Sequence, residues 1–110
     1  MPKPRVSAES YRETLLEVLK NPDEAAHYLN ACLEDGDARV FLLALRDVAD
    51  ARGGMRTLAH ETRLNRESLY RMLSRSGNPS LDSLAAVLSA CGLRLAVQSS
   101  VGRHRKRQIA

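Results

Sequence analysis

Apolar residues recur every three or four positions along most of the chain, which is the spacing of amphipathic helices. Side chains that cap helix N-termini stand before four of these segments, and glycines follow three of them. The pattern predicts helices that begin at Ser10, Asn21, Asp37 and Ser80, the last three over about 21–35, 37–52 and 81–91. The apolar positions expected to be buried in the last two are Val40, Phe41, Ala44, Leu45, Val48, Ala49, Leu81, Leu84, Ala85 and Leu88.

Residues 55–75 contain two short helical segments separated by only three residues, Arg63-Leu64-Asn65. The second segment, 66–74, has one apolar stripe, formed by Leu69, Met72 and Leu73. Two helices joined by so short a turn nearly touch, which explains the small Ala59. Asn65 can cap the second helix. This design is typical of a helix-turn-helix motif that reads DNA.

The outward face of the second segment carries guanidinium and hydrogen-bonding groups. Side chains in the first turns of a recognition helix reach base edges, and arginine can bind guanine through two hydrogen bonds. The candidate base contacts are Arg66, Glu67, Ser68, Tyr70 and Arg71. The candidate phosphate contacts, at the start of the preceding helix and in the following loop, are Arg56, Thr57, Arg75, Asn78 and Ser80. The alternative is an ordinary amphipathic helix with a solvated charged face, and Arg66 or Glu67 could simply position the other.

Residues 93–97 alternate apolar and mixed side chains, as a strand does. A lone strand leaves its backbone groups unpaired, so its simplest partner is the same strand of a second copy. We therefore expect a homodimer through Leu93, Leu95 and Val97. A coil or a continued helix lying on the core is the alternative.

Charge divides this 110-residue chain into regions of opposite sign, although its net charge is only +4. Residues 1–54 hold 7 basic and 10 acidic groups, and 55–98 hold 6 basic and 3 acidic groups. The segment 99–110 adds four basic residues and no acid, and we expect a disordered tail there that adds phosphate affinity or only solubility. The length suits one domain, over 1–98. The two signs suggest two partners, DNA for the basic half and a basic protein for the acidic helices between about 10 and 37.

No residues form a recognisable catalytic or metal-binding motif. Cys32 and Cys91 lie on apolar faces without zinc spacing, and we interpret both as buried apolar residues. His60 could reach a phosphate, although a solvated histidine fits as well. We expect no cofactor and no metal. Because no apolar run has the length of a signal peptide core or a membrane span, we expect a cytoplasmic protein.

The chain resembles the probable addiction-module antidote proteins, an Xre-like group within the lambda-repressor-type helix-turn-helix proteins. The matching residues are Tyr28-Leu29, Phe41-Leu42, Ala44-Leu45, Asp47-Val48-Ala49, Ala51-Arg52-Gly53, Leu58-Ala59, Glu61-Thr62, Leu64-Asn65-Arg66-Glu67-Ser68-Leu69-Tyr70-Arg71, Gly77-Asn78-Pro79-Ser80 and Gly92-Leu93. One departure is Arg63, which stands where such turns normally carry glycine. If that position needs positive φ, arginine costs on the order of 1 kcal/mol there.

The resemblance implies an all-α, lambda-repressor-like helix-turn-helix bundle, here with extra N-terminal helices and a short C-terminal strand. It also implies an antitoxin that neutralises a small RelE-like toxin and represses its own operon by binding double-stranded DNA. Two alternatives remain: a prophage-type repressor without a toxin, and a helical module that binds only proteins. The identity of the neighbouring gene would distinguish the antitoxin from the prophage-type repressor. Binding to promoter DNA would distinguish both from the module that binds only proteins.

Overall fold

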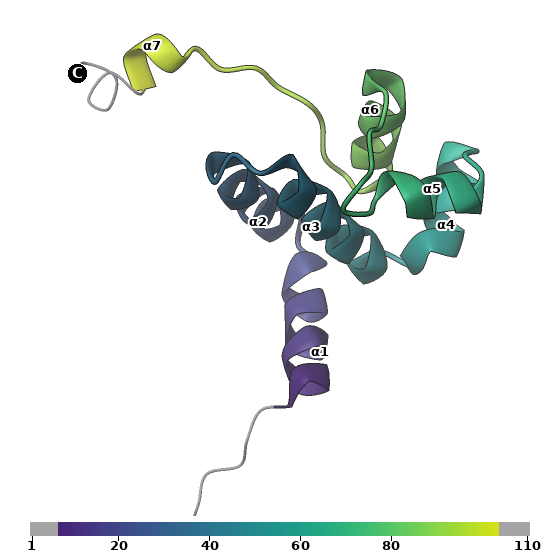
Figure 1. Cartoon of the computed structure of the whole chain (residues 1–110). Coiled ribbons are helices and arrows are strands. Elements are labelled where there is room, and N and C mark those ends of the chain that lie inside the picture. Colours follow the sequence, from purple (N-terminus) through teal and green to yellow (C-terminus); the bar gives the residue numbers. More distant parts are fainter. Residues whose placement is uncertain (1–6, 104–110) are drawn as a thin grey trace, which may run out of the picture.

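The computed structural model describes residues 7–103, and every regular element in that range is a helix. The helices are α1 (Ala8–Leu19), α2 (Pro22–Glu34), α3 (Ala38–Ala51), α4 (Gly54–Thr62), α5 (Arg66–Met72), α6 (Leu81–Ala90) and α7 (Ser100–Arg103). Figure 1 shows α2 and α3 side by side, with α4, α5 and α6 gathered at one end of α3. Helix α1 projects from this body, and α7 stands apart from it. The all-α prediction is confirmed, and no helix in the described range is long and apolar enough to cross a membrane.

Local capping chemistry fixes where the helices begin. The Asn21 side chain accepts the amide protons of Asp23 and Glu24 at 2.8 and 3.3 Å, and Asp37 accepts that of Arg39 at 2.9 Å. These two predicted starts are confirmed.

The predicted start of the first helix at Ser10 is wrong. Helix α1 begins at Ala8, and the Ser7 hydroxyl oxygen accepts the Ser10 amide proton at 3.0 Å. Ser7 supplies the same cap one turn earlier. This start also places Glu9 in the first turn, where the helix dipole favours a negative charge.

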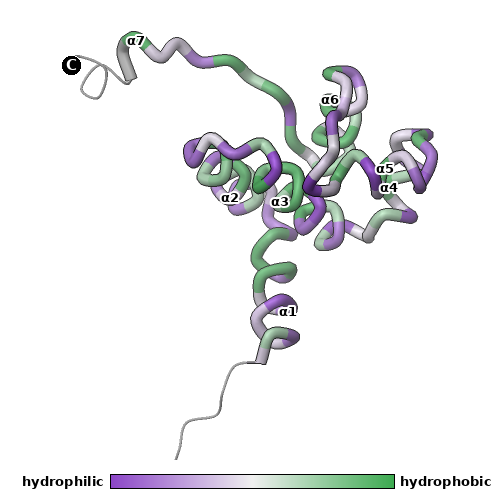
Figure 2. Tube along the Cα trace, in the orientation of Figure 1, coloured by the Kyte–Doolittle hydropathy of each residue, from purple (hydrophilic) through white to green (hydrophobic). Residues whose placement is uncertain are grey.

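Helix α3 lies at the centre of the core and contacts α1, α2 and α4. Its buried residues are Phe41, Leu42, Ala44, Leu45, Val48, Ala49 and Ala51. The expected burial of Val40 is wrong, because this residue is 41% exposed. The neighbouring helices cover Phe41 and Leu42, which follow it, instead. In Figure 2 the hydrophobic half of α1 is the end that meets this core.

Helix α6 packs against α4 through a face that differs from the predicted one. Leu88 is buried and Leu84 is partly buried, as expected, and Val87 joins them. Leu81 is 70% exposed and Ala85 is also exposed, so their predicted burial is wrong. Both residues lie on the side of α6 that its neighbours leave uncovered.

The segment that follows α6 runs away from the body without regular secondary structure over 93–99. The predicted strand over 93–97 is therefore absent from the single chain. The strand is expected to form only when it pairs with a second copy, so the paired strand of a dimer stays a prediction. Of the expected tail, residues 100–103 form the single turn of α7, and 104–110 lie outside the described residues.

A polar network ties the three N-terminal helices together. The Arg12 guanidinium of α1 donates to Asp47 at 2.9 Å and to Asp50 at 2.6 Å, both on α3. The Tyr28 hydroxyl of α2 donates to the other Asp47 oxygen at 2.9 Å. These carboxylates raise the pKa of Arg12, whereas burial and the Asp47 hydrogen bond raise that of Tyr28. Asp47 thus joins α1, α2 and α3 through one carboxylate.

We predict that Asp47→Ala lowers the free energy of unfolding by about 1–2 kcal/mol, because it removes a charge-assisted hydrogen bond together with the Tyr28 hydrogen bond. Asp50→Ala is the matched control on the same helix. It keeps the Arg12–Asp47 pair and should lower the free energy of unfolding by less than about 1 kcal/mol, because a partly exposed ion pair contributes little. Urea denaturation of both variants measures the difference, and equal losses would contradict the assignment of Asp47 as the shared partner.

Candidate nucleic-acid interface

Helices α4 and α5 pack against each other across a three-residue turn, 63–65. The predicted apolar contacts are confirmed: Leu58, Leu69, Met72 and Leu73 are buried, and Ala59 is partly buried. Because this stripe turns one side of α5 into the core, its opposite side faces outward.

Side-chain hydrogen bonds hold the turn between the two helices. The Thr62 hydroxyl donates to the Leu58 carbonyl oxygen at 2.7 Å and accepts the Leu64 amide proton at 3.2 Å. The Asn65 side chain then caps α5 by accepting the Ser68 amide proton at 3.2 Å, as the sequence predicts. The orientation of α5 relative to α4 therefore depends on two short polar side chains.

Arg63 closes α4 in the left-handed backbone conformation, with φ of 62°. It is the one non-glycine residue with positive φ in the described part of the chain. Similar turns usually carry glycine at this position, so we expected an energetic cost there if φ is positive. The structure shows that the turn does require the conformation that glycine adopts freely.

The exposed face of α5 displays four of the five predicted base-contact residues. Arg66, Glu67, Tyr70 and Arg71 are exposed, and they lie on adjacent turns at spacings of three and four residues. Neither Arg66 nor Arg71 pairs with a carboxylate among residues 7–101. Ser68 is only partly exposed, beside the buried stripe. The two guanidinium groups are therefore available to an external acceptor.

Arg46 of α3 also lies at this surface, although no sequence pattern indicates it. Its guanidinium carbon lies 4.6 Å from the centre of the Tyr70 ring, a cation–π contact. The contact fixes one face of the tyrosine and leaves the side chain 39% exposed. Only the packing of α5 near α3 creates this pair, since the two residues lie in separate helices.

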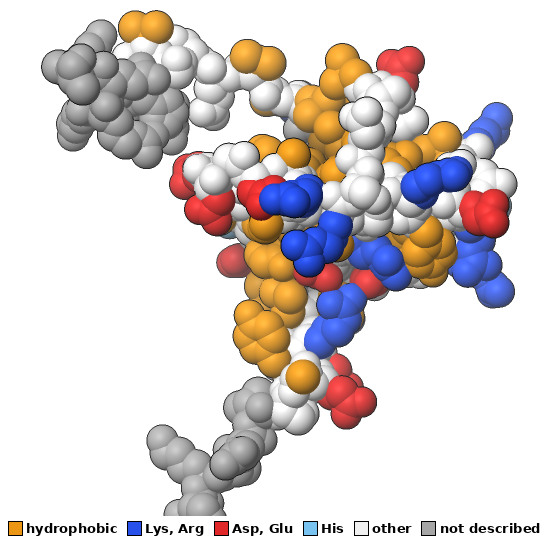
Figure 3. Space-filling model, viewed as in Figure 1, with side chains coloured by type: hydrophobic (Ala, Val, Ile, Leu, Met, Phe, Trp, Pro, Cys, Tyr) orange, Lys and Arg blue, Asp and Glu red, His pale blue; other side chains and the backbone are white. Residues whose placement is uncertain are grey.

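The predicted phosphate contacts surround α5 and differ in how free their polar groups are. Arg56, Arg75 and Asn78 are exposed. The Thr57 hydroxyl donates to the Gly53 carbonyl oxygen at 3.0 Å, and the Ser80 hydroxyl caps α6 at the Ser83 amide, 3.1 Å away. In Figure 3 blue side chains are spread over the side formed by α3, α4 and α5, with red ones among them at the α4–α5 end. Several red side chains gather at the end of the body where α2 leads into α3.

The loop between α5 and α6 folds back tightly against the end of α5. A Cβ atom at Gly77 would collide with the Met72 carbonyl oxygen, so only glycine fits. This close approach holds Asn78 and Ser80 near the C-terminal end of α5.

The predicted dimer residues differ in exposure. Leu93 packs partly against the core, whereas Leu95 and Val97 are 44% and 99% exposed. Cys91 is buried as predicted, and burial raises the pKa of its thiol to about 11. Cys32 is only partly buried. Among the residues that the structure describes, no three His, Cys, Asp or Glu side chains are arranged to hold a metal ion.

Comparison with known proteins assigns the family. A family model described as "Probable addiction module antidote protein" matches residues 11–99. An uncharacterised protein of Haemophilus influenzae is 37% identical over 84 residues, which cover 76% of this chain and 86% of that relative. No solved structure matches the chain significantly. The chain belongs to the family of probable addiction module antidote proteins, and an antidote of an addiction module implies a toxin partner.

We predict that Arg63→Gly stabilises the protein by roughly 0.5–1 kcal/mol. Relief of the left-handed backbone is worth about 1–2 kcal/mol, and the greater freedom of glycine in the unfolded chain offsets part of it. Arg56→Gly is the matched control, because it removes the same charge from an exposed residue within α4. It should destabilise by about 1 kcal/mol, the usual cost of glycine in a helix. Thermal unfolding checks both signs, and a loss of stability in both variants would contradict the strain at Arg63.

Proposed function

We propose that this protein is a cytoplasmic type II antitoxin that neutralises a small RelE-like toxin and represses its own operon. In the proposal it binds operator DNA as a homodimer, with α5 as the recognition helix of a lambda-repressor-like helix-turn-helix. The observation that carries the DNA-binding part is the outward face of α5. It has two guanidinium groups that pair with no carboxylate in the described part of the chain, on a helix whose other side is buried. Family membership carries the toxin part.

The chemistry of the α5 face suits base recognition in the major groove. Arg66 and Arg71 can each donate two hydrogen bonds to guanine, and Glu67 can accept from the cytosine amino group. Tyr70 is held against Arg46, so its exposed edge is preorganised. Arg56, Arg75 and Asn78 flank these residues and can fix the position of the helix on the phosphate backbone. Thr57 and Ser80 can add backbone amide contacts, since their hydroxyls already serve the helices.

Two other functions would use the same fold differently. A prophage-type repressor would bind DNA without a toxin, but family membership favours the antidote. A module that binds only proteins would not need unpaired arginines on the outward face of α5. Binding to the promoter fragment at physiological salt tests the second alternative, and co-expression with the adjacent gene tests the first.

We predict that Arg71→Ala weakens operator binding by about 1–3 kcal/mol, or roughly 5- to 150-fold, and relaxes preference at one base position. Arg75→Ala, the control, should weaken all sequences uniformly. It should also flatten the slope of log affinity against log salt by about 0.9, the effect of one lost phosphate contact. Titration of operator and scrambled DNA at several salt concentrations measures both. Uniform weakening by Arg71→Ala would show that Arg71 contacts phosphate.

We propose the apolar flank of α1 as the surface that binds the toxin. Tyr11 and Val18 are 65% and 44% exposed and lie two turns apart on one side of the helix. Figure 3 shows a continuous band of apolar side chains along α1 up to the body. Because α1 projects from the body, a partner can approach this band from the side.

The charges around this flank suit a basic partner. Glu9, Glu13 and Glu17 recur every four residues along another side of α1, and all three are exposed. A toxin that cleaves RNA needs a basic surface to hold phosphate. Exposed ion pairs add little affinity individually, so the apolar band would supply affinity and the carboxylates would speed association.

We predict that Val18→Asp abolishes protection of cells from the adjacent toxin while it leaves operator binding unchanged. Leu43→Asp, at a similarly exposed leucine on α3, is the control and should still protect. The double variant Arg66→Ala, Arg71→Ala should have the opposite effect: it should lose repression of the promoter and still protect cells from the toxin. Growth under toxin co-expression and promoter activity give the two measurements. Loss of protection in the α5 variant, at normal folding and abundance, would show that the two surfaces overlap.

A further inference from the structure

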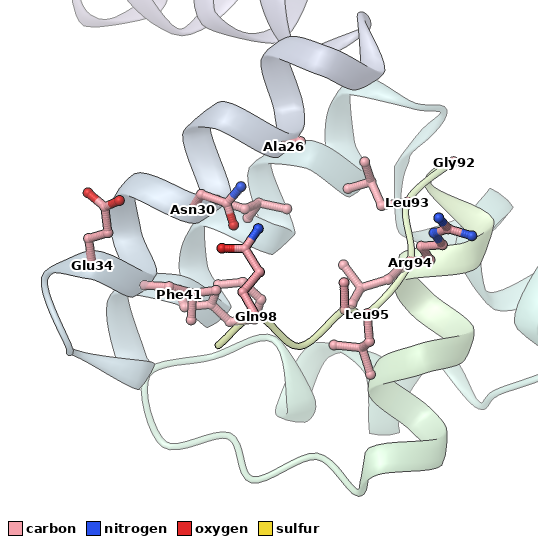
Figure 4. Close-up of a pocket in the computed structure, with 13 residues that line it drawn as sticks. Ala26, Asn30, Glu34, Phe41, Gly92, Leu93, Arg94, Leu95 and Gln98 are labelled. Carbon is pink, nitrogen blue, oxygen red and sulfur yellow. The ribbon is translucent and has the colours of Figure 1, made fainter. Parts of the chain in front are cut away.

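A groove of about 820 Å³ separates α2 from the segment that follows α6. One wall comes from α2, with Ala26, Asn30 and Leu33, and Phe41 of α3 continues it. The other wall is the segment 92–98, with Leu93 and Leu95 facing the space in Figure 4. A space of this size lies in the range that encloses a drug-sized ligand, about 300–1,000 Å³, so several side chains fit in it.

The segment 93–99, which we name the arm, has backbone groups without partners. The last backbone hydrogen bond before the arm leaves the body runs from the Leu93 amide to the Leu88 carbonyl oxygen, at 2.8 Å. Residues 94–98 make no backbone-to-backbone hydrogen bond with any other described residue. Extended backbone in this state offers an edge for another strand.

Apolar side chains are uncovered both in the groove and on the arm. Leu33, in the α2 wall, is 53% exposed, and Val97 of the arm is 99% exposed. Val97 does not line the groove of its own chain. An arm from another copy would therefore bring an apolar side chain that its own chain does not use.

We propose that this groove receives the arm of a second copy of the chain, so that two arms pair as antiparallel strands and each is held between the partner arm and the α2 helix. The inference rests on the proposed homodimer and adds the surface that receives the arm. Burial of the apolar side chains supplies the affinity, and pairing of the two arms satisfies their backbone groups.

Charge and hydrogen-bonding groups favour the arm over an unrelated peptide. The charged side chain on the α2 wall is Glu34, whose carboxylate lies at the open end of the groove in Figure 4. The arm carries one basic residue, Arg94, and no acid. The Arg94 guanidinium points away from its own groove in Figure 4, so the glutamate is left for a cation from elsewhere. The Asn30 and Gln98 amides face the same space and can serve the ends of the inserted strand.

Crosslinking between two differently tagged copies tests the docking directly. Both copies carry Cys32→Ser and Cys91→Ala, which remove the native thiols. One copy then carries Leu33→Cys and the other Val97→Cys, and a short bismaleimide is added to the mixture. Because each chain has a single thiol, a contact within one chain cannot produce the mixed product. The control replaces Leu33→Cys by Val18→Cys, a residue of similar exposure on α1.

We expect the Leu33–Val97 product to exceed the Val18–Val97 product by about tenfold or more. Independently, Leu33→Asp in the full chain should raise the dimer dissociation constant at least about tenfold in sedimentation equilibrium, whereas Val18→Asp should leave it unchanged. Equal crosslinking from both positions, or an unchanged dissociation constant for a folded Leu33→Asp, would overturn the docking even if the protein is a dimer. A monomeric unaltered protein at micromolar concentration would overturn the docking and the dimer together. Neither measurement depends on DNA or toxin binding. Failure of the arm docking can therefore be distinguished from failure of the proposed antitoxin function.

Discussion

The positions of α1, α2 and α4 depend directly on the burial of α3. Seven of its 14 residues are buried, and a single neighbour cannot cover so wide an apolar surface. Helices α1 and α2 cover part of it and α4 covers another part. Because the 63–65 turn holds α5 against α4, the orientation of the α5 face follows from how α4 packs on α3. The Arg46–Tyr70 contact makes this dependence direct, since it joins α3 to the exposed face of α5.

The same constraint determines which surfaces remain for partners. Helix α1 reaches the core through Leu16 and Leu19, near its C-terminal end, so its flank with Tyr11 and Val18 stays uncovered. The Asp47 network holds α1 at this angle by joining its exposed half to α2 and α3. The side chains that would contact a toxin or DNA are therefore not the ones that hold the core. This separation allows either surface to be altered while the fold is kept.

The sequence predicted what is decided locally and missed what depends on distant packing. Asn21, Asp37, Asn65 and Ser80 cap helices as expected, because a cap joins a side chain to a backbone amide two or three residues away. The buried stripe of α5 was also predictable, since its apolar residues follow the helical period. Exposure of Leu81 and Ala85 was not, because periodicity defines an apolar face but does not show how far a neighbouring helix covers it. Of the candidate site, the α5 face was predictable from its spacing, whereas Arg46 entered it only through tertiary contact.

Arg63 shows how the proposed function and stability can oppose each other in a single turn. Its left-handed backbone costs on the order of 1 kcal/mol, which glycine would avoid. The exposed side chain places a permanent positive charge at the start of the turn that leads into α5. If α5 binds DNA as proposed, that charge lies beside a helix docked on a polyanion, where a phosphate contact adds affinity for any sequence. The strain would then be the cost of a cation that glycine cannot supply, and it can be tolerated because the turn is already held by Thr62 and Asn65 on either side.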